Sequence, residues 1–284
     1  MKKVWLVSDC VVSPLGSTTP ENYRNLHSGI SGINLVDDPQ LSPVQFYGGR
    51  ISQAITHSPL TKFEYISARA IQQVIEQLTI PLDKCLFILS TTKGNIGFIE
   101  EGHPDHPRIH LHATAYFLAK RFGFAHHLVV SNACISGVLS LIVAKRWIES
   151  GKYDHAVVVG AEVLSRFVIS GFQSLQALSP EQCRPFDAAR KGINLGECAA
   201  AIVLTSRPDE LGARARLRVT GGGLSNDANH ISGPSRTGEE LAFAIRQAME
   251  EASLETTDID FISAHGTATL YNDEMESRAF TLAG

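Results

Sequence analysis

The chain alternates between short, continuously apolar runs and longer stretches in which apolar residues recur every three or four positions. The short runs resemble buried strands, and the longer stretches have the spacing of amphipathic helices. We predict strands at 4–10, 85–89, 128–130, 153–160, 199–204, 217–221 and 259–263. We predict helices at 20–28, 61–78, 113–122, 135–150, 239–252 and 273–282, and helix followed by loop at 172–179, with Thr19 as the cap of the first helix. Strands alternating with helices indicate a largely parallel sheet with helices on both faces.

Two stretches interrupt this alternation. Residues 31–59 are rich in Gly, Ser, Pro and polar side chains without a sustained period, which predicts a long surface excursion. Residues 207–214 carry Pro, Gly and charges and are the best candidate for a linker. After the linker the order of strand, loop, helix and strand begins again, although no residue-level repeat accompanies it.

A cysteine follows the apolar run at 128–130. Cys134 lies between this predicted strand and the predicted helix, which indicates a strand, a sharp turn carrying the thiol, and a buried helix. The unpaired N–H groups at a helix N-terminus favour a thiolate, so Cys134 is a candidate nucleophile. The competing interpretation is a small, inert, buried side chain, which is what most cysteines are.

A histidine follows the last predicted strand. His265 lies in the loop 264–269, and ligands bind at the carboxyl ends of strands in open parallel sheets. A pairing of Cys134 with His265 across a shared cleft is therefore geometrically reasonable, whereas the plainer interpretation is a loop histidine bonded to backbone. Asn272 and Asp273 are predicted to cap the final helix.

The amino-acid composition excludes several classes of protein. With 44% hydrophobic and 19% charged residues the chain is of ordinary globular type, and a net charge of -4 with scattered Lys and Arg gives no support for nucleic-acid binding. No segment approaches the roughly 18 apolar residues of a membrane span. The five cysteines form no CxxC pair, so reduced thiols in a cytoplasmic protein fit better than disulfides or zinc.

One histidine-rich tract suggests a metal site. Residues 100–112 contain His103, His106, His110 and His112, but two prolines preclude the regular helix that would align a pair of them. No cysteine is interspersed. A solvated loop is the favoured interpretation, and we expect neither a metal ion nor a cofactor.

Five motifs in order carry a family resemblance. They are SNACISG around Cys134, GFQSLQALS at 171–179, CRPFDAARKGINLGECAAAIVL at 183–204, DANHISGP at 227–234, and AHGTATLYNDEMESRAF at 264–280. Together they resemble the β-ketoacyl-acyl carrier protein synthases, which are condensing enzymes of the thiolase superfamily. The resemblance is closest to the fatty-acid elongation type and its relatives in aryl-polyene or polyketide pathways.

The resemblance implies a thiolase-like αβαβα layered fold of two similar halves, with residues 1–210 as a complete N-terminal half and 211–284 as a truncated C-terminal half. It implies a decarboxylative Claisen condensation in which Cys134 takes an acyl group from a carrier protein and attack by the carbanion from malonyl-carrier protein gives a 3-ketoacyl product. His265 matches one of the family's two catalytic histidines. The backbone N–H of Cys134 would be one oxyanion donor.

The family pattern continues beyond the HGT motif with a lysine, a second histidine and a glycine-rich loop, none of which follows here. We therefore expect this polypeptide to condense poorly or not at all by itself, with self-acylation of Cys134 surviving better, and to leave a strand edge uncovered. Two alternatives stay open: a noncatalytic subunit or fragment used for dimerisation or carrier binding, and a thioester hydrolase using Cys134, His265 and Asp273.

The implied partners are an acyl carrier protein and a second synthase subunit in a homodimer or heterodimer. Carrier proteins are acidic, so basic side chains are the candidates for contact. These candidates are Lys62, Arg69, Lys120 and Arg121, for each of which a solvated surface role is an equal alternative.

Overall fold

The computed structural model describes residues 2–52, 59–213, 217–228 and 233–284. Parts of three predicted features lie outside these residues: the surface excursion at 53–58, the linker at 214 and the DANHISGP motif at 229–232. The chain divides into two compact units. The first comprises Met1–Asn34, Gly49–Arg166 and Gly196–Val219, and the second comprises Leu35–Gly48, Phe167–Leu195 and Thr220–Gly284.

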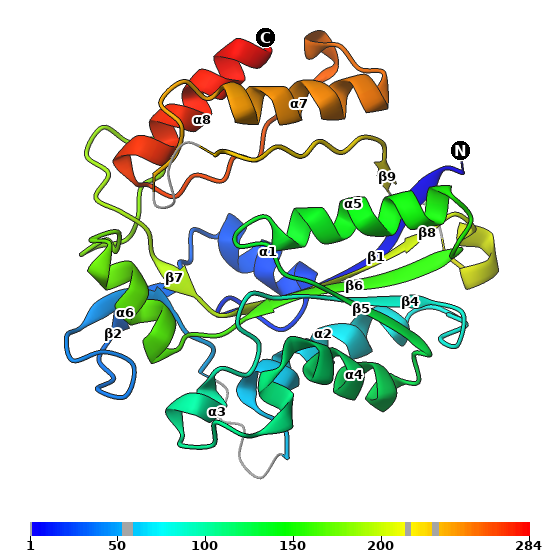
Figure 1. Ribbon diagram of the computed structural model, residues 1–284, viewed down its shortest axis with the longest axis horizontal. Coiled ribbons are helices and arrows are strands. Elements are labelled where there is room, and N and C mark those ends of the chain that lie inside the picture. Colours follow the sequence, from blue (N-terminus) through cyan, green and yellow to red (C-terminus); the bar gives the residue numbers. More distant parts are fainter. Residues whose placement is uncertain (1, 53–58, 214–216, 229–232) are drawn as a thin grey trace. The chain divides into compact units, whose positions relative to one another are not determined.

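The first unit is built on a six-stranded sheet with the order β5-β4-β6-β8-β1-β9 (Figure 1). The strands are β1 (Val4–Val12), β4 (Leu86–Ser90), β5 (His126–Val130), β6 (His155–Glu162), β8 (Cys198–Thr205) and β9 (Leu217–Val219). β4 runs parallel to β5 and β6, whereas β6 with β8, β8 with β1, and β1 with β9 are antiparallel. The prediction of a largely parallel sheet is wrong, because a strand buried on both faces is apolar throughout in either direction.

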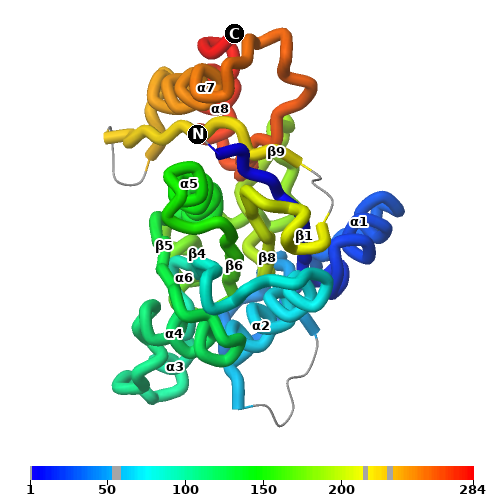
Figure 2. Tube along the Cα trace, turned by 90° about the vertical axis from the view of Figure 1, so that its right-hand side faces the viewer, coloured from blue at the N-terminus to red at the C-terminus, as the bar shows by residue number. Residues whose placement is uncertain are grey.

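Helices cover both faces of this sheet, as predicted. α2 (Lys62–Ile75) and α4 (Leu111–Phe122) lie on one face, and α5 (Ser136–Glu149) lies on the other (Figure 2). Successive side chains of β4 point to opposite faces of the sheet and so join the hydrophobic cores on both faces. Phe87 and Leu89 pack with α2 and α4, and Leu86 and Ile88 pack with α5. Since each fully buried side chain of this kind contributes about 1.5–3 kcal/mol, β4 stabilises both layers.

Helix N-termini are set by threonines. Thr61 and Glu64 form a capping box at the start of α2, with the N–H of each residue donating to the other's side chain at 3.1 Å. α1 (Thr19–His27) is capped by Thr18, whose Oγ1 accepts from the N–H of Glu21 at 3.3 Å. The prediction of Thr19 as the cap was wrong by one residue, because only Thr18 precedes the N–H of Glu21 by the required three positions.

The remaining elements are short or belong to the second unit. They are β2 (Ile33–Val36), β3 (Phe46–Gly49), β7 (Leu195–Gly196), α3 (Gly97–Glu100), α6 (Arg166–Ser174), α7 (Glu239–Ala252), α8 (Leu270–Ala283) and the 3-10 turns Pro107–Ile109, Pro208–Leu211 and Thr256–Asp258. β2, β3 and β7 form a three-stranded sheet. The stretch 31–59 therefore contains strands that were not predicted, because four residues are too few to establish a period.

The predicted second round of elements forms only in part. α7 has the predicted bounds, and α8 begins at Leu270 rather than at residue 273. β9 ends at Val219 and pairs with β1 in the sheet of the first unit. The predicted strand at 259–263 is absent from the described residues, since its backbone has no strand beside it. Apolar content favoured a strand there, but a strand needs a neighbour.

Candidate functional site

The turn that carries Cys134 has a strained backbone held by one hydroxyl. Ala133 has φ +45°, a left-handed conformation that costs a residue with a side chain about 1–3 kcal/mol. The Ser136 hydroxyl accepts from the N–H of Asn132 at 2.8 Å and donates to the carbonyl of Ala133 at 2.7 Å. Because these bonds span the turn, they hold Cys134 at the N-terminal end of α5.

Cys134 is the exposed thiol of the five cysteines. Cys10 and Cys85 are buried, and burial raises the pKa of Cys10 to about 11 and that of Cys85 to about 12. Burial also raises the pKa of Cys198 to about 11. These three thiols stay protonated near neutral pH, whereas Cys134 combines access to solvent with the positive end of a helix dipole.

α5 is only partly buried, which corrects the prediction of a buried helix. Ser140, Ala144 and Ile148 lie on its buried face, but Val138, in its first turn, is 60% exposed. Ile135, beside Cys134, is also exposed. The apolar composition of the helix did not distinguish the two faces.

The loop that carries His265 is held by a buried carboxylate. Glu276 is 4% exposed; its Oε1 accepts from the N–H of His265 and its Oε2 from the N–H of Gly266, both at 2.8 Å. The side chain of Asn272 donates a third bond to Oε2 at 3.1 Å. A carboxylate that accepts from two successive N–H groups fixes the backbone conformation of the loop.

A second buried carboxylate joins this loop to the CRPFDAAR motif. Asp273 accepts from the N–H of Ala268 at 3.1 Å and from the N–H of Phe186 at 2.7 Å, and Arg190 lies 3.7 Å from it. Thr269, not Asn272 or Asp273, is the N-cap residue of α8. The predicted cap was therefore wrong, and both side chains bind the loop or its supporting carboxylate instead.

Sequence reasoning missed Glu276 and Arg190. Two acidic residues three positions apart on a helix share one face, so Asp273 and Glu276 could have been recognised as a pair facing the preceding loop. No comparable signal pointed to Arg190, which donates to the carbonyl of Leu270 at 2.8 Å. Cys134 belongs to the first unit and His265 to the second. Their pairing stays a prediction.

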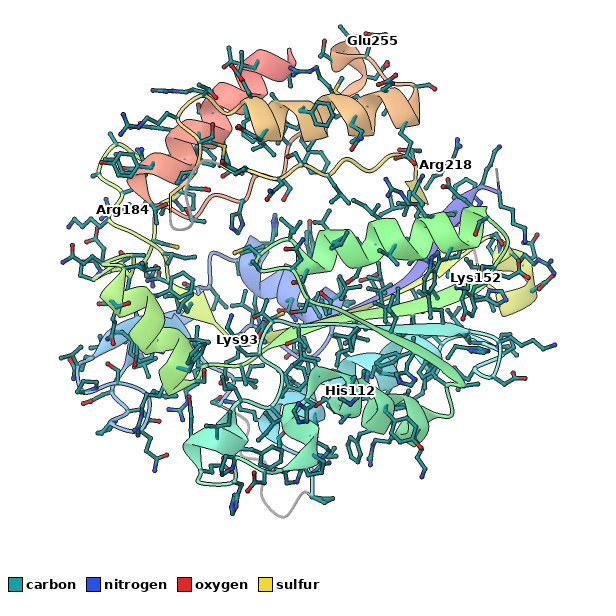
Figure 3. The ribbon with its side chains drawn as sticks, viewed as in Figure 1. Lys93, His112, Lys152, Arg184, Arg218 and Glu255 are labelled. Carbon is teal, nitrogen blue, oxygen red and sulfur yellow. The ribbon has the colours of Figure 1, made fainter. Side chains whose placement is uncertain are left out.

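The histidine tract makes ring contacts. His106 stacks on Phe98 with centroids 3.7 Å apart and accepts from the N–H of Arg108 at 3.2 Å. His112, labelled in Figure 3, lies at the start of α4, and its ring stacks with that of His110. Within the described ranges no group of three His, Cys, Asp or Glu residues has the arrangement of a metal site. No described helix is long and apolar enough to cross a membrane.

The basic residues predicted to contact a carrier protein differ in their exposure to solvent and in their ion-pair partners. Lys62 lies 2.5 Å from Glu197, a buried carboxylate that also accepts from the N–H of Ile51 at 2.8 Å. Arg69 is half-buried, and Lys120 and Arg121 are exposed near the end of α4. Lys62 thus has a structural partner, whereas the α4 pair faces solvent.

Comparison with known proteins places the chain in a family. The model "Beta-ketoacyl synthase, N-terminal domain" matches residues 114–210, and "Beta-ketoacyl synthase, C-terminal domain" matches residues 217–283. Nodulation protein E of Rhizobium leguminosarum bv. trifolii is 39% identical over 153 residues, covering 53% of this chain but only 38% of that protein. The putative mitochondrial 3-oxoacyl-[acyl-carrier-protein] synthase of Schizosaccharomyces pombe is 25% identical over 99% of this chain and 77% of its own length.

Solved structures agree with these matches. The ketosynthase ApeO, solved in complex with its chain length factor ApeC from Xenorhabdus doucetiae, superposes with a TM-score of 0.87 at 27% identity. The superposition covers 100% of this chain and 76% of the compared chain. The predicted thiolase-like α/β fold is confirmed by this agreement. Since the two family models together match more than half of its residues, the chain belongs to the β-ketoacyl synthase family of the thiolase superfamily.

Proposed function

We propose that this chain provides the acyl-accepting part of a 3-oxoacyl-[acyl-carrier-protein] synthase. The observation that carries the proposal is the exposed Cys134 at the N-terminus of α5, on a turn with a left-handed residue held by Ser136. Such a turn presents the sulfur outward, and the helix dipole favours its negative charge. Membership of the β-ketoacyl synthase family supports the same reaction class.

The proposed chemistry has two stages. The Cys134 thiolate attacks the carbonyl carbon of an acyl thioester, and the carrier-protein thiolate leaves and takes up a proton. A malonyl thioester then loses CO2, and the resulting carbanion attacks the acyl-enzyme carbonyl. The 3-ketoacyl thioester forms as the Cys134 thiolate leaves. We assign to the His265 imidazole N–H the stabilisation of the enolate oxygen after decarboxylation.

The two halves of the synthase fold are proposed to divide near residue 210, with Cys134 in 1–210 and His265 in 211–284. The family models support this division, because their matches end at 210 and resume at 217. Division by contacts differs from this boundary. Leu35–Gly48 and Phe167–Leu195 belong to the second unit, and β9 (Leu217–Val219) joins the first unit through its pairing with β1.

Acyl carrier protein is the proposed partner, and the exposed pair Lys120 and Arg121 is the best-supported contact. Acidic carrier helices favour such basic positions. A second synthase-like subunit is also proposed, either a further copy or a related chain, because ApeO was solved with its chain length factor.

Intact-protein mass spectrometry after incubation with acyl-carrier protein tests the proposal. The wild-type chain and Cys183→Ala should gain one acyl group, whereas Cys134→Ala should gain none. Cys183 is the matched control because it is half-buried and outside the turn. Absence of acylation on the wild type would overturn the proposal. Acylation without condensation on malonyl-carrier protein would indicate a synthase impaired in the condensation step, and release of free acid would favour the hydrolase.

A further inference from the structure

A cavity of about 670 Å³ lies in the second unit, beside α8. Four of its lining residues share one face of α8, since they are spaced by three, one and three positions: Tyr271, Glu274, Met275 and Arg278. The segment 233–236, just before α7, supplies the remaining lining. Small-molecule sites in proteins have volumes of about 300–1,000 Å³, so this cavity has the size of a ligand site.

The segment 233–238 is held against α8, where α7 begins in Figure 1. Asp227 accepts from the N–H of Ser235 at 2.5 Å, and the buried Ser235 hydroxyl accepts from the N–H of Gly238 at 3.2 Å. Gly238 has φ +78° and approaches α8 so closely that a Cβ there would lie 2.7 Å from the carbonyl oxygen of Met275. The fold therefore forms this wall of the cavity without a ligand.

Two exposed arginines line the cavity together. Arg278 donates to the carbonyl of Arg236, which is a neutral acceptor, and neither guanidinium has an ion-pair partner within the described residues. Arg184 and Arg190 of the same unit, by contrast, each lie beside a carboxylate. A guanidinium donates two parallel hydrogen bonds to phosphate oxygens. This pair of uncompensated charges therefore indicates a ligand that carries phosphate groups.

The cavity also offers an aromatic face and a hydrogen-bond acceptor. Tyr271 is 71% exposed and lines the cavity with the apolar side chains of Pro234 and Met275. A nucleobase stacks on such a ring whatever its sequence of donors and acceptors. The Glu274 carboxylate is an acceptor of the kind that binds ribose hydroxyls, and Arg190, 3.6 Å away, offsets its negative charge.

We propose that this cavity binds a nucleoside phosphate. The base stacks on Tyr271, and the ribose hydroxyls donate to Glu274. The phosphates bind between Arg236 and Arg278. Free nucleotides and coenzyme A thioesters both carry this group, so the chemistry is shared by two sources. The site lies outside the turn that carries Cys134 and does not depend on its acylation, so this proposal and the proposed function fail independently.

Isothermal titration calorimetry of the full chain tests the proposal with ADP, coenzyme A and inorganic pyrophosphate. The wild-type chain should bind ADP saturably, and Arg236→Gln and Arg278→Gln should each weaken binding about tenfold or more, as loss of a charge-assisted hydrogen bond does. Tyr271→Leu should weaken binding of ADP but not of pyrophosphate, which has no base. Arg246→Gln is the matched control and should leave affinity unchanged. Arg246 is also exposed and donates to a carbonyl, that of Leu282 at 3.1 Å, but lies outside the cavity.

The probes also distinguish the two sources. Equal affinities for ADP and coenzyme A would identify a free nucleotide as the ligand, and binding of coenzyme A that is tighter by about tenfold or more would identify its thioesters. Three results would overturn the proposal: no saturable binding of ADP or coenzyme A up to about 1 mM, pyrophosphate bound as tightly as ADP, or equal weakening by Arg236→Gln and Arg246→Gln.

Discussion

At the scale of single residues, the buried carboxylate of Glu276 fixes the backbone conformation of the loop that carries His265. Glu276→Gln replaces one accepting oxygen with an NH2 group, so one of the two N–H groups of residues 265 and 266 loses its acceptor. An unsatisfied buried donor costs about 1–3 kcal/mol. We expect a loss of that size in the free energy of unfolding measured with urea.

The matched control is Glu274→Gln, two residues away on α8. The Glu274 side chain is 49% exposed and lies 3.6 Å from Arg190, so solvent screens its charge and the pair contributes little to stability. Its substitution should change stability by less than about 0.5 kcal/mol. Equal effects of the two substitutions would contradict the role assigned to Glu276.

The cysteines should differ sharply in reactivity. With a pKa of about 11, Cys10 and Cys198 are only about one part in a thousand thiolate at pH 8, and Cys85 less still. Iodoacetamide should therefore modify Cys134 first. Labelling of Cys198, which is only partly buried, should rise about tenfold per pH unit up to its pKa. Peptide mass mapping measures both, and early modification of Cys85 would contradict the structure.

At the scale of elements, the cap of α1 distinguishes two neighbouring threonines. Thr18 caps the helix, whereas the hydroxyl of Thr19 is buried with no hydrogen-bond partner. Thr18→Ala should lower stability by about 0.5–2 kcal/mol. Thr19→Ala should be close to neutral, because it removes a polar group that is already unsatisfied. Thermal unfolding of the two variants checks this, and the reverse order would contradict it.

The contact between His155 of β6 and Thr205 of β8 should make the stability of the protein depend on pH. Burial lowers the pKa of His155, whose Nδ1 lies 2.8 Å from the Thr205 hydroxyl. A lowered pKa means that the unfolded chain takes up the proton first. The contribution is therefore present above the ordinary pKa of about 6.5 and is lost as pH falls below it. His155→Gln should flatten the pH dependence of stability between pH 7 and 5, whereas His112→Gln, at an exposed position, should not.

The elements also show where sequence patterns were sufficient. α2, α4 and α7 were predictable because each has one apolar face. The extended segment at 259–263 was predicted as a strand from composition alone, which says nothing about neighbours. β2 and β3 were missed because four residues leave no period. Strand direction in the main sheet was mispredicted, because continuous apolar runs carry no information about it.

At the scale of the whole molecule, the five motifs identified the family from sequence, and the family models and solved structures agree. The candidate residues Cys134 and His265 came from motif positions. The spacing of Asp273 and Glu276 was a sequence signal for the support of the His265 loop. Ser136 and Arg190 had no such signal, because each acts through a backbone group whose position only the folded chain defines.

The position of β1 between β8 and β9 sets an order of events during synthesis. Residues 4–12 are made before their partners, which lie at 198–205 and 217–219. At the usual 5–20 residues per second, about 10–40 s pass before either neighbour emerges. During that time the apolar segment 4–12 has no strand partner. Slower translation between residues 12 and 198 should therefore increase the binding of this segment by chaperones.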